Sequence, residues 1–189
     1  MICLLFHFTF LSFALNMDGA AAVLFYFSIY AFFGWLLENF YSYFTTNVFY
    51  KENFFLGPFK PMYGFAPVLL VLFIRQDTPR PVLFLSCFLI PTFVEYLSGV
   101  LLQKFTGKQW WDYSHLPIQL HGHICLPFSL CWIFLSIICI KWLHPAVSSL
   151  YDTFSEIWLF VWPIVLLYFL WELFFAIRRH VPESHMQLG

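Results

Sequence analysis

The chain has 189 residues, of which 61% are hydrophobic and only 10% are charged, and its formal net charge is −1. Soluble domains carry about 25% charged residues, so this chain has too few charges to cover the surface of a soluble protein. The composition therefore excludes a soluble enzyme, and the absence of a basic field argues against a nucleic-acid partner. It predicts a protein of the cell membrane whose main partner is the lipid bilayer.

Apolar segments along the chain have lengths suited to membrane crossing. A bilayer core of about 30 Å requires about 20 apolar residues in a helix, because lipid cannot pair with exposed backbone groups. In chain order the candidate spans are 20–44, 61–74, 81–102, 124–140 and 157–177. The predicted fold is all-α: a polytopic transmembrane helical bundle of about five spans, some of them broken or containing proline.

The domain prediction has three parts. Residues 1–19 form an apolar N-terminal extension that could be an additional helix, and they lack the basic start of a signal peptide. Residues 20–180 form a single transmembrane bundle, and 181–189 form a polar C-terminal tail. No convincing internal repeat is present, so the inverted-repeat pattern of many transporters is missing.

Orientation follows from the basic residues between spans. One side of the membrane receives six of them and the other receives three. The larger group is Lys51, Lys60, Lys104, Lys108, Arg178 and Arg179, and the smaller group is Arg75, Arg80 and Lys141. Since cytoplasmic loops carry the excess of Lys and Arg, a multi-pass protein with a cytoplasmic C-terminus is expected.

Two glutamates, Glu38 and Glu95, fall inside predicted spans. A carboxylate at the centre of a span costs about 2.5–3.5 kcal/mol, so such groups usually turn into the bundle. There they could bind a cation, relay a proton, pair with a base or only fix the packing. The hypothesis is that both point into one shared polar cavity. Glu172 is expected to be an interfacial group near Arg178.

The stretch 57–64 cannot continue a straight helix, because it contains two glycines and two prolines. Its predicted structural residues are Gly57, Pro58, Pro61, Tyr63 and Gly64. Lys60, between the prolines, could meet an anion, could serve as the counter-charge for the glutamates, or could be solvated at an ordinary interfacial loop. Close helix approach is expected at Gly34, Gly57, Gly64 and Gly99.

A third polar cluster follows the third predicted span. Asp112 and Tyr113 come directly after Trp111, and His123 follows in an H-x-H pair. We expect Asp112, Tyr113 and His123 to contribute to the cavity or to hydrogen-bond their loop, and Trp111 to anchor it at the interface. The spacing is a weak signal for a metal, and no cofactor motif or nucleotide-binding P-loop is present, so neither metal nor cofactor is predicted.

Five motifs occur in a fixed order: GWLLE at 34–38, NFFLGPFKPMYG at 53–64, EYLSG at 95–99, WDYS at 111–114 and GHICL at 122–126. In order and spacing they resemble the bacterial type IV ABC-transporter family of CmpB-like, permease-type membrane proteins, from about Phe25 to Pro145. The family commonly has Arg at the position of His123, Glu at that of Gln103 and a basic residue at that of Gln109. The resemblance implies that an ion network of relatives would be weakened here.

The resemblance implies a permease that moves a small solute or a lipid with a separate ATP-binding subunit. Two other functions fit the same residues. One is a membrane-embedded lipid-handling enzyme, with Glu38, Glu95 and Lys60 around a headgroup. The other is a non-catalytic membrane scaffold whose broken spans hold a partner. A polar cavity would favour the permease or the lipid-handling enzyme over the scaffold.

Overall fold

The computed structural model describes residues 17–180. Most of the predicted N-terminal extension, residues 1–16, and the tail at 181–189 lie outside the described residues. The described elements are α2 (Met17–Thr46), α3 (Pro61–Phe73), α4 (Arg80–Thr106), β1 (Gln119–Leu120), β2 (Ile124–Cys125), α5 (Leu126–Ile138), η1 (Cys139–Leu143) and α6 (His144–His180). The protein is mostly helical, as predicted, with one two-stranded hairpin between α4 and α5.

Three helical stretches are long and apolar enough to cross a membrane, and α3 is a shorter apolar helix of 13 residues. They are 18–46, 80–106 and 126–180. The described residues therefore support a membrane protein, but five separate spans are not confirmed. Two differences account for this: α3 is short, and the last stretch is continuous where the sequence predicted a break between 140 and 157.

The expected break is a π-helical turn in a continuous helix of 55 residues. Pro145 has no backbone N–H, so it cannot donate to the carbonyl four residues earlier. Directly before it, the His144 N–H bonds to the carbonyl of Cys139, five residues back. One wide π-helical turn accommodates the proline, and the chain remains helical on both sides of it.

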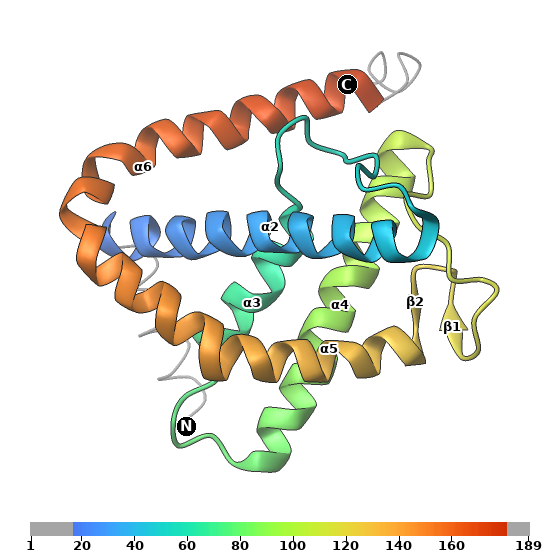
Figure 1. Cartoon of the computed structure of the whole chain (residues 1–189), viewed down its shortest axis with the longest axis horizontal. Helices are drawn as coiled ribbons and strands as arrows, with labels where there is room; N and C mark the ends of the chain where they lie inside the picture. The colour runs from blue at the N-terminus through green and yellow to red at the C-terminus, as the bar shows by residue number, and fades with distance from the viewer. Residues whose placement is uncertain (1–16, 181–189) are drawn as a thin grey trace.

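The long helix bends back around the molecule (Figure 1), so that α5 and the last part of α6 are drawn on either side of α2. The first half of α6 packs on the start of α2, where Val147 and Phe25 share a buried cluster. The second half contributes Phe169 to another buried cluster, with Phe55 of the loop between α2 and α3. This curvature brings α6 to the candidate site described below.

Helices α2 and α3 pack closely where glycine leaves room. A Cβ atom at Gly34 would overlap the side chain of Tyr63, and one at Gly64 would overlap Phe27. Gly57 and Gly99 are also tightly enclosed, by Tyr168 and His123. At each of the four glycines a neighbouring side chain therefore occupies the space that a Cβ atom would need.

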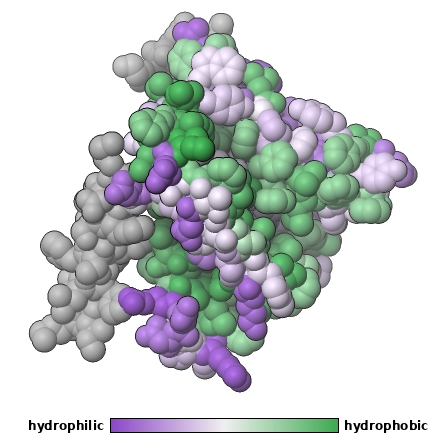
Figure 2. All heavy atoms as spheres, turned by 60° about the vertical axis from the view of Figure 1, so that its left-hand side comes forward, coloured by the Kyte–Doolittle hydropathy of each residue, from purple (hydrophilic) through white to green (hydrophobic). Residues whose placement is uncertain are grey.

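Large apolar side chains cover much of the surface, as lipid requires. Along α6, Phe160, Ile164 and Leu167 are 82%, 66% and 65% exposed. Their spacing places them on one helix face. Figure 2 shows hydrophobic residues spread over the face in view, with hydrophilic residues gathered mainly at its margins.

Three basic regions meet at one end of the molecule (Figure 1). Lys108, after α4, lies 2.5 Å from the Glu52 carboxylate in the loop between α2 and α3. Arg179, near the end of α6, donates to the Asn53 carbonyl over 3.1 Å. The sequence grouped these regions on one side of the membrane, and the structure places them side by side.

Candidate binding cavity and the three buried glutamates

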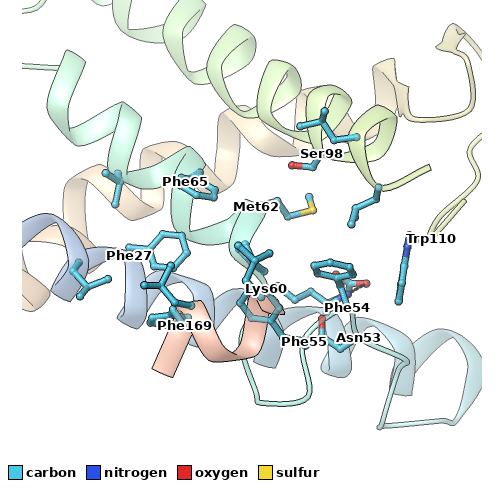
Figure 3. Close-up of a pocket in the computed structure, with 18 of the residues that line it drawn as sticks. Phe27, Asn53, Phe54, Phe55, Lys60, Met62, Phe65, Ser98, Trp110 and Phe169 are labelled. Carbon is cyan, nitrogen blue, oxygen red and sulfur yellow. Dashed lines mark ion pairs between the residues drawn. The ribbon is translucent and has the colours of Figure 1, made fainter. Parts of the chain in front are cut away.

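A cavity of about 630 Å³ lies between α2, α3, α4 and α6, and is bordered by the loops after α2 and α4. Figure 3 shows Phe27, Phe65 and Phe169, from three different helices, gathered toward one end of it. Lys60 lies in the middle of the view, with Asn53, Phe54 and Phe55 beside it and Trp110 at the far side. The cavity is mostly apolar with a few convergent polar groups, which is the usual character of a ligand site.

Glu38 is one of the two carboxylates at this cavity, together with Glu52. It pairs with Lys51 at 2.8 Å and with Lys60 through the same oxygen. The side chains of Glu38 and Lys60 are only 15% and 13% exposed, whereas that of Lys51 is 39% exposed. Two cations share one carboxylate, so this ion cluster carries a net charge of +1. Lys60 is the counter-charge that the position of its loop predicted.

The loop between α2 and α3 is held in shape by its own hydrogen bonds. The amide of Asn53 donates to the carbonyls of Gly57 at 3.1 Å and Phe59 at 2.9 Å. The Lys60 N–H donates to the carbonyl of Ala31 in α2 over 3.0 Å. Pro61 then begins α3, at a helix position where its missing N–H costs nothing. These bonds fix the backbone from which Lys60 reaches Glu38.

Glu95 is satisfied differently, by neutral donors. The Tyr113 hydroxyl donates to one of its oxygens at 3.1 Å and the Trp132 indole to the other at 2.7 Å. Burial raises the pKa of Tyr113, and the neighbouring Glu95 raises it further, so the phenol remains a donor. Glu95 is 2% exposed and belongs to the interior.

The predicted shared cavity is therefore only partly formed. Glu38 lines the larger cavity, and Glu95 is not among its lining residues. Tyr63 of α3 packs against Gly34 of α2 and against the ring of Trp132, which donates to Glu95. Tyr63 and Trp132 also line a second cavity of about 330 Å³. Glu38 and Glu95 therefore do not share the lining of the larger cavity.

Glu172 is the buried carboxylate that the sequence interpretation missed. It is 2% exposed, so the prediction of an interfacial group near Arg178 was wrong. It accepts the backbone N–H groups of Leu56 at 2.7 Å and Gly57 at 2.9 Å, and the hydroxyl of Tyr168 at 2.8 Å. Tyr168 lies four residues earlier on the same helix face, which was a signal available in the sequence. The amide donors come from a distant loop and were not visible there.

Asp112 stabilises its own loop rather than lining the cavity. It accepts the Ser114 N–H at 2.8 Å and the Ser114 hydroxyl at 3.0 Å. The backbone bond and then the side-chain bond lower the pKa of this exposed carboxyl. Trp111, beside it, does line the cavity, and its indole donates to the His123 carbonyl at 2.8 Å.

His123 is buried at the base of the hairpin. Its Nε2 lies 3.0 Å from Oε1 of Gln103, and desolvation lowers the pKa of the imidazole. Gln103 and His123, two of the three positions at which the sequence comparison expected a departure from the family pattern, are thus in direct contact. Within residues 17–180, no group of three His, Cys, Asp or Glu residues is arranged to hold a metal ion.

The tight turn before His123 depends on a glycine. His121 and Gly122 have φ values of 53° and 70° and lie at the centre of a turn in which the His123 N–H donates to the Leu120 carbonyl over 3.1 Å. A Cβ at Gly122 would lie 2.7 Å from both Asp112 Oδ1 and Gln109 Nε2. The third departure, Gln109, therefore also lies beside this turn.

Comparison with known families gives one result that covers most of the chain. The family described as "Putative ABC-transporter type IV" matches residues 25–177. The chain belongs to this family, and it is a membrane protein of transporter type. No curated protein and no solved structure matches it.

Proposed function

We propose that this member of the type IV ABC-transporter family is a multi-pass permease subunit, which moves a small solute or a lipid with a separate ATP-binding partner. The family and the apolar helices support a transporter of the membrane. The sequence has no G-x-x-x-x-G-K-[ST] motif for nucleotide phosphates. Energy from ATP would therefore come from another subunit.

The observation that carries this proposal is the ion cluster at the large cavity. Glu38, Lys51 and Lys60 all border a cavity that is otherwise lined mainly by apolar side chains. Charged groups within a membrane bundle are costly and commonly mark substrate or ion pathways. We assign cargo contact to Glu38 and Lys60. Glu95, Tyr113, Asp112 and His123 support the neighbouring helices and hairpin.

The proposed topology keeps residues 20–180 as one bundle with five crossings. At 1.5 Å per residue, the 55-residue helix is about 82 Å long, more than twice the bilayer core of about 30 Å. Its bend allows two crossings, corresponding to the predicted spans 124–140 and 157–177. The basic end formed by Lys51, Lys108 and Arg179 would face the cytoplasm together with the C-terminus.

A lipid-handling role is the second candidate, and the apolar lining of the cavity favours it. Phe27, Phe65 and Phe169 would suit an acyl chain better than a small polar solute. Among the described residues that line the cavity, Ser98 is the one hydroxyl nucleophile, and it is not hydrogen-bonded to a general base. We therefore rank lipid transfer above lipid chemistry.

Purification from native membranes tests the proposal. The tagged chain, extracted in mild detergent, is expected to retain a stoichiometric subunit that contains a P-loop and hydrolyses ATP. The same complex in proteoliposomes should show ATP-dependent movement of a cargo lipid or solute. The control is chemical crosslinking of the native membranes before extraction, which would retain a weakly bound subunit. If the chain still purifies without an ATPase, the ABC-type mechanism is contradicted.

A further inference from the structure

We propose that the large cavity binds an anionic amphiphile, with its headgroup at Lys60 and Lys51 and its acyl chain between α2, α3 and α6. This inference deepens the proposed function by naming the class of cargo, and as a statement about cargo it rests on that function. Binding itself is independent of transport and is measured separately below.

The sign of the headgroup's charge follows from the charged side chains around it. Glu38 neutralises one of the two lysines, which leaves a net charge of +1 in the cluster. Glu52, the other carboxylate at the cavity, is already paired with Lys108. An anionic group is therefore attracted to this end, and a cationic one is repelled.

Lys60 also has hydrogen-bonding capacity to spare. An ammonium has three donors. Among the described residues, Glu38 is the only partner of the Lys60 ammonium. The side chain is held at the cavity and is largely shielded from solvent. A phosphate or carboxylate oxygen would gain a charge-assisted hydrogen bond there without displacing the existing ion pair.

The apolar part of the ligand follows from the rest of the lining. Phe27, Phe65 and Phe169 gather in it with Leu166 and Leu170 of α6, and Phe54 and Phe55 lie beside Lys60 itself. The volume of about 630 Å³ lies within the usual range of about 300–1,000 Å³ for ligand pockets. One cavity therefore combines a shielded ammonium with a mainly apolar lining rich in aromatic rings, which matches a molecule with a charged head and a hydrocarbon chain.

The test is native mass spectrometry of the full chain in detergent, with three probes. Oleoyl lysophosphatidic acid has the anionic head and the chain, oleoyl lysophosphatidylcholine has the same chain with a zwitterionic head, and inorganic phosphate has no chain. We expect the anionic lysolipid to bind about tenfold more tightly than the zwitterionic one, and phosphate not to compete at matched concentration. Lys60→Gln should remove most of this headgroup preference. If that variant does not fold, Lys51→Gln, at the more exposed lysine, should reduce it.

A matched pair on α6 tests the acyl chain. Leu166→Trp adds bulk inside the cavity and should weaken lysolipid binding at least fivefold. Leu167→Trp makes the same change at a neighbouring residue outside the lining and should leave binding unchanged. Equal affinity for the two lysolipids, equal effects of the two tryptophans, or binding of phosphate as tight as that of the lysolipid would each overturn the inference. Lysolipid binding without an ATPase partner would leave this inference standing while the proposed transport mechanism fails.

Discussion

Glu38 and Glu95 are both carboxylates inside membrane helices, yet the protein stabilises them in different ways. Glu95 is enclosed by a phenol and an indole, which are neutral donors supplied by Tyr113 and Trp132. Glu38 is matched by two ammonium groups at the edge of a cavity. The neutral donors satisfy the Glu95 carboxylate inside the protein. The two ammonium groups at the cavity, in contrast, keep N–H donors that a ligand can use. The difference separates a structural carboxylate from a candidate functional one.

Glu172 extends the comparison, because it resembles Glu95 and not Glu38. It accepts hydrogen bonds from two backbone amides and one tyrosine, and it fastens the loop that carries Lys60 to α6. The loop is also held by Arg179, through the carbonyls of Asn53 and Phe54. The lysine to which we assign cargo contact therefore lies on a loop that a glutamate of another helix holds in place.

The largest effect on stability is expected from Glu172→Ala. The substitution removes the acceptor of the partly buried amides of Leu56 and Gly57, at a cost of roughly 1–3 kcal/mol. Thermal unfolding of the purified protein in detergent should show a clear decrease in Tm. Glu156→Ala, at an exposed carboxylate on the same helix, is the control and should change Tm little. Equal shifts would show that the Glu172 bonds do not hold the loop.

Glu95→Gln is expected to have an intermediate effect. Glutamine keeps the shape, but one carboxylate oxygen becomes an NH2 group, which can bond the Tyr113 hydroxyl only by donating to it, while the amide oxygen accepts from the Trp132 indole. The exchange replaces a carboxylate acceptor by neutral hydrogen bonds, so the expected loss of stability is about 1–2 kcal/mol, with binding at the large cavity unchanged. Tyr113→Phe in the same background removes the partner of the new NH2 group and should add to the loss. A double variant as stable as Glu95→Gln would contradict this role.

Gly99→Ala should have a smaller effect, confined to the hairpin. A Cβ at this position would lie 2.7 Å from Nδ1 of His123, so the imidazole and its contact with Gln103 must shift. We expect faster proteolysis at 107–125 with nearly the same Tm, because the hairpin sits outside the helical core. Gly107→Ala is a control for added bulk, since no atom lies within 4 Å of its Cβ position, although its φ of 69° adds local strain. Unchanged proteolysis in Gly99→Ala would argue against close packing.

The smallest effect is expected at the Glu52–Lys108 pair, which is largely exposed. The hydrogen bond from Lys108 lowers the pKa of Glu52 below its ordinary value of 4.5. The pair therefore adds stability above pH 4.5, and this contribution is lost as the pH falls through the lower folded pKa. Lys108→Ala should reduce stability at pH 7 by less than about 1 kcal/mol and remove this part of the acid dependence. A loss of several kcal/mol would show that the pair is not a surface contact.

The sequence predicted those features that depend on neighbouring residues. Apolar length located the helical segments, and the prolines and glycines at 57–61 located the loop before α3. The pairing of Lys60 with Glu38 could be anticipated because a charge in a span needs a partner and the loop follows that span. The different surroundings of Glu38 and Glu95 could not be anticipated. They depend on Trp132 and Tyr113, which reach Glu95 only in the folded bundle.

Two failures have specific physical reasons. The continuous helix through Lys141 and Trp142 was missed because polar residues suggested a loop, while the π-turn that accommodates Pro145 leaves no composition signal. The burial of Glu172 was missed because its partners are backbone amides of Leu56 and Gly57, more than 110 residues away in the chain. Side-chain identity alone carries no information about such donors.

The most direct test of the central distinction compares Glu38→Gln with Glu95→Gln in the binding of oleoyl lysophosphatidic acid. Removing the Glu38 charge frees both lysines, so the anionic lysolipid should bind several-fold more tightly. Glu95→Gln should lower Tm without altering the affinity. If the two variants change affinity equally, or if Glu38→Gln leaves it unchanged, the assignment of Glu38 to the site and Glu95 to the interior is contradicted.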